Sequence, residues 1–349
     1  MTQPVRPAPI AAVMHGQPMW GVYRTPFRIV NLADARLPGV MNWSRGRMRN
    51  ARMKEWQHFA IIHPDVYITM AIVDAKLAST SFLCVFDRKT GELIEHDRMA
   101  TSAATTLPDQ LFDGRFEFSS RGYDIKVRNR LVEKHHRLEF KVGVVGAPKS
   151  VFGELKLLED LDVVSPLVAM LPLGKNRPFY THKVPCPIEG ELLIGDRQVV
   201  FDPKRDLALV DVHKAYYPMH TIWRWGTFAG YLPDGRIVGA NLTHNVIKDD
   251  ETSNENALWL GDKIERLSAA RFEIPDNPMD DWKVSTTDGR VSLSLHPEGI
   301  RKALTRIGPV KSQYLQPFGK YSGVMVTAEG ERLDIDGMFG PGEYHEVWW

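Results

Sequence analysis

The sequence predicts an all-β protein with two tandem barrel-like domains of antiparallel strands and a few short helices. Three observations support this fold class. Dipeptides typical of tight hairpins recur along the chain, stretches of apolar or alternating residues lie between them, and helical periodicity is scarce. Closely spaced strands with tight turns are typical of sandwiches and barrels. At 349 residues, the chain is also longer than one hydrophobic core usually spans, which favours two domains.

The predicted elements follow the turns in chain order. Gly and Asp tolerate the positive φ of tight hairpins, and turn dipeptides lie at 113–114, 195–196, 234–235, 261–262, 288–289 and 329–330. Strands are predicted within residues 66–87, 115–132, 136–146, 190–202, 236–247, 283–295 and 321–335. Short helices are predicted at Pro108–Phe112 and His296–Leu304.

The domain boundary is predicted near Pro178. The segment Leu171–Pro187 contains four prolines and interrupts the rhythm of strands, as a hinge would. We therefore expect a disordered lead-in over residues 1–19, an N-terminal β domain over 20–177 and a C-terminal β domain over 178–349.

Composition excludes several classes of function. The formal net charge of +1 argues against a protein that binds nucleic acid or anionic lipid, so the basic stretch from Arg45 to Lys54 is expected to be a solvated loop. No apolar run is long enough for a transmembrane segment or a signal peptide, and a cytoplasmic location is expected. The two cysteines, Cys84 and Cys186, are expected to be unpaired thiols, although one disulfide stays an alternative.

The hairpin around Asp234-Gly235 can be assigned a register. Pro233 lacks the N–H that a closing pair needs, so the loop has three residues and Leu232 pairs with Arg236. This register sets opposite residues on one face. One face carries Trp223, Trp225, Thr227, Asn241, Thr243 and Asn245, and the other carries Arg224, Gly226, Phe228, Ala240, Leu242 and His244. We expect the tryptophan face to point into the lumen, because ligand cavities combine aromatic walls with a few polar groups.

The residues also resemble a known family. The run from Phe179 to Gly230 combines a lysine (Lys183), a glycine before a hydrophobic hairpin (Gly190), an aspartate (Asp211), a Tyr-Pro pair (Tyr217) and a Trp-x-Trp motif. With Asn241, the Glu255–Gly261 segment, the C-terminal run from Phe318 and the stretch Lys54–Ile61, this pattern resembles the bacterial domain of unknown function DUF2804. That family is distantly similar to the hydroxyneurosporene synthase and AttH superfamily. The resemblance implies two lipocalin-like, calycin-type barrels with a ligand site in or between them.

Several residues are candidates for the site. Asp211 and His220 are candidate catalytic acids, because burial beside tryptophan would raise the pKa of a carboxylic acid and keep it protonated; Asp211 as a turn-capping residue is the alternative. Trp223 and Trp225 are candidate walls for a planar ligand, or they fill the barrel. The other candidate ligand-binding residues are Lys183, which could instead pair with Asp211, and Tyr217, Asn241, His244 and Glu255.

Two functions follow from these predictions. The first is binding of a small apolar ligand of lipid, terpenoid or polyene type. The alternative is a cofactor-independent hydratase, isomerase or cyclase that acts on such a ligand with a buried Asp or His. No cofactor is expected, because nucleotide-binding and serine-hydrolase motifs are missing. No metal is expected, since adjacent His135 and His136 point to opposite sides of a strand. The sequence leaves the oligomeric state open.

Overall fold

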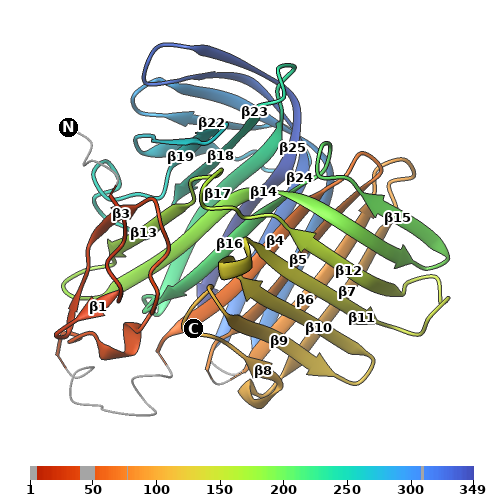
Figure 1. The fold of residues 1–349 in the computed structure, drawn as a ribbon, viewed down its shortest axis with the longest axis horizontal. Helices are drawn as coiled ribbons and strands as arrows, with labels where there is room; N and C mark the ends of the chain where they lie inside the picture. The colour runs from red at the N-terminus through yellow and green to blue at the C-terminus, as the bar shows by residue number, and fades with distance from the viewer. Residues whose placement is uncertain (1–5, 40–51, 77, 308–309) are drawn as a thin grey trace. The chain divides into compact units, whose positions relative to one another are not determined.

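The protein consists almost entirely of antiparallel strands (Figure 1). The computed structural model describes residues 6–39, 52–76, 78–307 and 310–349. Its contacts divide the chain into two compact units. We call the described part of 6–170 and 175–216 the N-terminal unit, and residues 171–174 with the described part of 217–349 the C-terminal unit. The all-β prediction is confirmed.

The N-terminal unit contains a sheet that the described residues build from 14 strands. Along its main path the order is β7-β6-β5-β4-β16-β14-β12-β11-β10-β9-β8, while β13 and β15 also pair with β14, and β3 pairs with β13. The strands are β3 (Gly21–Tyr23), β4 (Lys54–Ile62), β5 (Val66–Asp74), β6 (Ser79–Asp87), β7 (Leu93–Ala100), β8 (Thr105–Thr106), β9 (Gly114–Ser120), β10 (Tyr123–Arg130), β11 (His135–Val142), β12 (Val151–Leu157), β13 (Leu167–Pro172), β14 (Pro178–Ile194), β15 (Arg197–Phe201) and β16 (Leu207–Ala215).

The C-terminal unit contains a sheet of 9 strands among the described residues, in the order β20-β19-β18-β17-β25-β24-β23-β22-β21. The strands are β17 (His220–Tyr231), β18 (Ile237–His244), β19 (Ala257–Leu260), β20 (Lys263–Arg266), β21 (Ala270–Glu273), β22 (Trp282–Thr286), β23 (Val291–Ile307), β24 (Val310–Val326) and β25 (Arg332–Trp348). Each sheet curls into a half-barrel (Figure 1).

Strand alternation explains where each core lies. In β10, Tyr123, Ile125 and Val127 are buried in the core of the N-terminal unit, while the residues between them are charged and point the other way. The C-terminal unit has its own core, to which Phe228, Leu242 and Trp282 belong. Both cysteine thiols are free and buried.

The two predicted helices are wrong. His296–Leu304 lies inside β23, which is paired with β24 from Val291 to Ile307 with one irregularity. A ladder of this length outweighs the weak helical pattern of one short segment. Pro108–Phe112 is irregular, and the described residues contain only short 3-10 turns: η1 (Leu32–Asp34), η2 (Ser102–Ala104) and η3 (Leu131–Glu133). No helix among the described residues has the length and apolarity that crossing a membrane requires.

The lead-in and the boundary differ from expectation. Within residues 6–19, β1 (Val13–Met14) pairs with β2 (Gln17–Pro18), and Ala12 and Val13 are buried in the core. This segment is therefore ordered, because its apolar residues have a core to join. Pro178 begins β14, which pairs with β12 and β16 of the same unit, so the division by contacts falls after Tyr216. Prolines at strand positions remove one N–H each but keep an extended chain.

The basic stretch is only partly described. Trp43, Arg45, Arg47 and Arg49 lie outside the described residues. Lys54 departs from the expected solvated loop, because it is buried in β4 and its Nζ donates to the Ala75 carbonyl at 2.7 Å. Burial lowers the pKa of Lys54 to about 8.

Candidate functional site

Asp211 lies in a buried row of polar side chains on three neighbouring strands of the N-terminal unit. In register, Asp211 of β16 is opposite Lys183 of β14 on one side and His58 of β4 on the other. Lys183 Nζ is 2.8 Å from Asp211 Oδ1, and His213 Nε2 is 2.9 Å from the same oxygen. All four residues are buried. We call Lys183, Asp211, His213 and His58 the Asp211 cluster.

The charge state of Asp211 differs from the prediction. Burial by itself raises the pKa of this carboxyl, but the neighbouring His213 and Lys183 outweigh burial and hold the pKa far below its ordinary value. Asp211 is therefore a carboxylate, and it cannot serve as the protonated acid that the sequence analysis expects. A nearby cation reverses the effect of burial, and the tryptophan argument did not include that cation.

His213 is held in a fixed orientation. Its ring stacks on Trp56 at a centroid distance of 4.6 Å and meets Phe179 edge-on at 4.9 Å. Its Nε2 faces Asp211 and lies 3.3 Å from Thr181 Oγ1, so Nδ1 is on the opposite edge of the ring. A histidine oriented by a carboxylate is a common arrangement for proton transfer near neutral pH. Sequence reasoning missed His213, although it shares a strand face with Asp211.

A second buried carboxylate, Glu343, lies in the C-terminal unit. It accepts three hydrogen bonds from neutral donors: Trp223 Nε1 at 2.6 Å, Tyr314 Oη at 2.8 Å and Gln316 Nε2 at 3.1 Å. His345 packs edge-on against Trp223, with centroids 4.2 Å apart. Burial and the nearby Arg301 lower the pKa of His345 to about 3, so this ring is neutral at neutral pH. Sequence reasoning missed Glu343, because no spacing connects it to Trp223, 120 residues earlier.

The hairpin register is confirmed, whereas the expected face is wrong. Trp225 lies opposite Thr243 and Phe228 opposite Ala240, as predicted. The core of the C-terminal unit, however, contains the Phe228, Ala240 and Leu242 face. Aliphatic and aromatic side chains on that face bury more apolar area against the core than the amide-bearing face could.

The tryptophan face is buried and hydrogen-bonded. Trp225 Nε1 donates to Asn241 Oδ1 at 2.7 Å, and Asn241 Nδ2 donates to the backbone carbonyl of Glu255 at 2.6 Å. Three of the predicted site residues therefore lie together. Glu255 orients Asn241 through its main chain and not through its carboxylate.

The remaining candidates in the C-terminal unit lie at its strand ends. The His220 side chain is 44% exposed, its Nε2 is 2.8 Å from Glu346 Oε1, and its ring stacks on Trp348 at 3.9 Å. Tyr217 is buried, with its ring 6.2 Å from that of Trp223. Asp211 and Lys183 belong to the N-terminal unit, whereas His220 and Tyr217 belong to the C-terminal unit.

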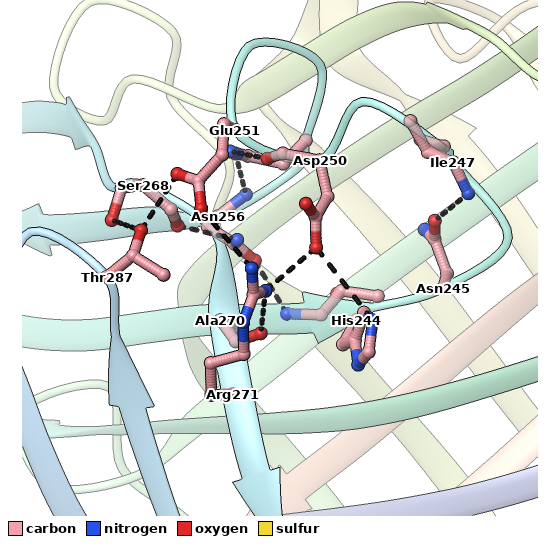
Figure 2. Close-up of polar contacts among 12 residues, drawn as sticks. His244, Asn245, Ile247, Asp250, Glu251, Asn256, Ser268, Ala270, Arg271 and Thr287 are labelled. Carbon is pink, nitrogen blue, oxygen red and sulfur yellow. Dashed lines mark hydrogen bonds and ion pairs between the residues drawn. The ribbon is translucent and has the colours of Figure 1, made fainter.

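His244 belongs to a cluster of charges near the end of β18. Figure 2 shows His244 facing Asp250, with Nε2 3.8 Å from Oδ2, and Arg271 reaching both Asp250 at 2.8 Å and Glu251 at 3.2 Å. Burial lowers the pKa of His244, and the nearby Arg224 lowers it further. Nothing in this arrangement gives His244 a special role in ligand contact.

A fully buried polar chain runs through the interior of the N-terminal unit. Glu159 contacts His136 Nε2 at 2.7 Å and His182 Nε2 at 2.9 Å. His136 Nδ1 is 2.7 Å from Asn129 Oδ1, which accepts from Gln57 Nε2 at 3.0 Å. Strand alternation could have revealed this chain, because His182 and Asn129 occupy inward positions of β14 and β10. The residues that the structure describes contain no His, Cys, Asp or Glu group suited to hold a metal.

A small pocket opens in the N-terminal unit beside the Asp211 cluster. Its lining includes Tyr180, Phe116, Val212, His213 and Lys214. The volume of about 20 Å³ is enough for one water molecule.

Two antiparallel sheets, each curled into a half-barrel around its own core, define a two-domain lipocalin-like protein. The chain belongs to the family Domain of unknown function (DUF2804), whose family model matches residues 13–349, so that predicted resemblance is confirmed. No curated protein matches the sequence significantly. The further similarity to hydroxyneurosporene synthase and AttH stays a prediction.

Two solved structures share the fold. CghA with Sch210972 has 12% sequence identity and a TM-score of 0.55, and the match covers 85% of this chain and 88% of that one. Kievitone hydratase from Nectria haematococca has 12% identity and a TM-score of 0.50, with the same coverage of 85% and 88%. At this identity the similarity shows the fold alone.

Proposed function

We propose that this protein is a cofactor-independent enzyme of the hydratase, isomerase or cyclase type, acting on a small apolar substrate. The observation that carries the proposal is the buried Asp211–His213 pair, with Nε2 and Oδ1 2.9 Å apart and Lys183 on the same carboxylate oxygen. The fold is shared with a protein named as a hydratase, which agrees with the proposal.

In this mechanism His213 is the proton carrier. The carboxylate of Asp211 favours the imidazolium form of His213 and orients it, so that Nδ1 gives a proton to an alkene carbon or a carbonyl oxygen. In hydration, a water molecule then adds to the cationic carbon and returns a proton to His213, so that one water is added overall. In isomerisation or cyclisation, the substrate itself returns the proton. The face of Trp56 is suited to stabilise the intermediate cation.

Plain binding, the other predicted function, has weaker support. A carrier needs an apolar cavity and a few polar groups. It has no need for a carboxylate kept ionised against a histidine by a lysine, since burying charges costs free energy. The Asp211 cluster therefore favours catalysis.

The test starts from a captured ligand. Purified protein is incubated with a hydrophobic cell extract, and bound molecules are identified by native mass spectrometry. The captured molecule is then incubated in deuterated water with wild type, His213→Gln, Asp211→Asn and the control His135→Gln, which alters a partly exposed histidine of β11. Wild type and control should add one water or incorporate deuterium, and His213→Gln should be slower by about 10²–10⁴-fold.

Binding and folding are measured alongside turnover. The His213→Gln and Asp211→Asn variants should keep ligand affinity within about tenfold and retain a cooperative thermal transition. A ligand that wild type binds and returns without chemical change or deuterium uptake would indicate a carrier and overturn the proposal. Unchanged turnover in a folded His213→Gln variant would remove His213 from the mechanism.

A further inference from the structure

Four cations lie side by side across four neighbouring strands of the N-terminal unit. In register, Arg115 of β9 is opposite Arg128 of β10, Arg128 is opposite Arg137 of β11, and Arg137 is opposite Lys156 of β12. Opposite residues share a face of a sheet. The neighbouring residues Phe116, Val127 and Leu138 are buried in the core, so the cations are on the outer face. We call these four residues the cation row.

The cation row is unfavourable unless negative charge balances it. Like charges directly opposite each other on neighbouring strands destabilise a sheet. Three of the four cations have a carboxylate partner: Arg115 with Glu117 at 2.6 Å, Arg137 with Glu154 at 2.5 Å and Lys156 with Glu189 at 3.3 Å.

Arg128 differs from its neighbours. It is exposed, and within the part of the chain that the structure describes it makes no hydrogen bond and no ion pair. It is therefore an exposed guanidinium between two other cations, with its five N–H donors directed to no protein acceptor.

A surface pocket of about 100 Å³ opens at this position. Its lining consists of Lys126, Arg128, Arg137 and Glu139. Glu139 is already bonded to Lys141 at 2.5 Å, and this bond lowers the pKa of Glu139, so its charge is compensated. The pocket is several times larger than a water site and has an excess of positive charge.

We propose that this pocket binds a phosphate group, either inorganic phosphate or the phosphate of a small monoester. The planar guanidinium of Arg128 matches two oxygens of a tetrahedral oxyanion, while Arg137 and Lys126 supply further donors. A dianion here also removes the repulsion within the cation row. The proposed site is independent of the proposed enzymatic function, because it uses none of the residues of the Asp211 cluster.

The experiment measures thermal unfolding of the full chain at pH 7.5 against increasing phosphate, with ionic strength held constant by sodium chloride. Wild type should gain Tm along a saturating curve. Arg128→Gln should lose the saturating gain, with Kd at least about tenfold higher. The control is Arg332→Gln on β25, an exposed arginine paired with Asp334 at 3.1 Å, which should behave as wild type.

Two further comparisons make the result decisive. Without phosphate, Arg128→Gln should be at least as stable as wild type, because the substitution removes the repulsion. Tighter binding of phenyl phosphate than of inorganic phosphate would support a monoester ligand, and the reverse order would support free phosphate. A gain in Tm that is linear and equal in all variants reflects exclusion of the salt from protein surface and would overturn the proposal, as would saturation that survives in Arg128→Gln or its absence in wild type.

Discussion

Lys183 of β14 and Asp211 of β16 lie directly opposite each other, and Lys183 Nζ is 2.8 Å from Asp211 Oδ1. The antiparallel register of these two strands brings together residues that are 28 positions apart in the sequence. Both side chains are buried, so each charge depends on the other for compensation. This pair determines the charge state of the whole Asp211 cluster.

Lys183→Met should destabilise the protein by about 3–5 kcal/mol, because it leaves a buried carboxylate without its lysine. Urea unfolding at pH 7 measures this loss. The double variant Lys183→Met/Asp211→Asn should lose less than the sum of the two single losses, since it leaves no uncompensated charge. Strictly additive losses would mean that the two side chains do not interact.

Glu159 should make stability depend on acid pH. Burial raises its pKa, but His182 and His136 outweigh burial and lower the pKa from 4.5 to about 2. A lowered folded-state pKa adds stability that is full above the unfolded-state value and is lost as pH falls toward 2. The full contribution is about 3 kcal/mol, of which about 2 kcal/mol is lost between pH 6 and pH 3.

The measurement is urea unfolding of wild type and Glu159→Gln at both pH values. The difference in stability between the two proteins should shrink by about 2 kcal/mol at the lower pH. If that difference is the same at pH 6 and pH 3, Glu159 is not ionised in the folded state.

Asn241→Ala should cost about 1–3 kcal/mol, because it removes the acceptor 2.7 Å from the buried Trp225 indole nitrogen. Guanidinium unfolding followed by tryptophan fluorescence measures the loss. The matched control is Asn245→Ala, which alters a half-buried asparagine whose Oδ1 accepts only a local bond from the Ile247 amide at 2.9 Å. Equal losses in the two variants would assign no special weight to the Trp225 contact.

Gly190→Ala should destabilise the N-terminal unit by more than about 2 kcal/mol. Gly190 has a φ of +126°, and a Cβ there would lie 2.3 Å from the Glu154 carbonyl oxygen of the facing strand. Gly122→Ala isolates the clash, because Gly122 also has a positive φ, +69°, but nothing within 4 Å of the added carbon. The two thermal shifts should differ clearly, and similar shifts would mean that the backbone of β12 moves aside without cost.

The local part of the fold could be predicted from sequence. The register of the Trp225 hairpin follows from one proline, Pro233, whose missing N–H excludes the shorter loop. The direction of its faces does not follow, because both faces are buried and only the distant strands that pack on them determine which one joins the core. His296–Leu304 shows the same limit, since its strand state depends on pairing with β24.

The candidate site was predictable only where residues are close in sequence or occur in a family motif. Asp211 and Lys183 belong to such a motif, and alternation within β16 would have added His213. Glu343 and Glu159 were out of reach, since their partners come from strands that are far away in the chain. Charges of this kind are paired by topology, which no short-range pattern encodes.

The pairing of β4 with β16 has a consequence for how the protein is made. Residues 54–62 wait for residues 207–215 before that edge of the sheet is satisfied, so about half of the polypeptide is synthesised while β4 has an open edge. Open strand edges invite pairing with other chains, and such distant contacts form slowly. Truncation before Leu207 should therefore yield aggregates in place of a smaller folded domain, and a ribosome-bound nascent chain should become protease-resistant only after β16 has left the exit tunnel.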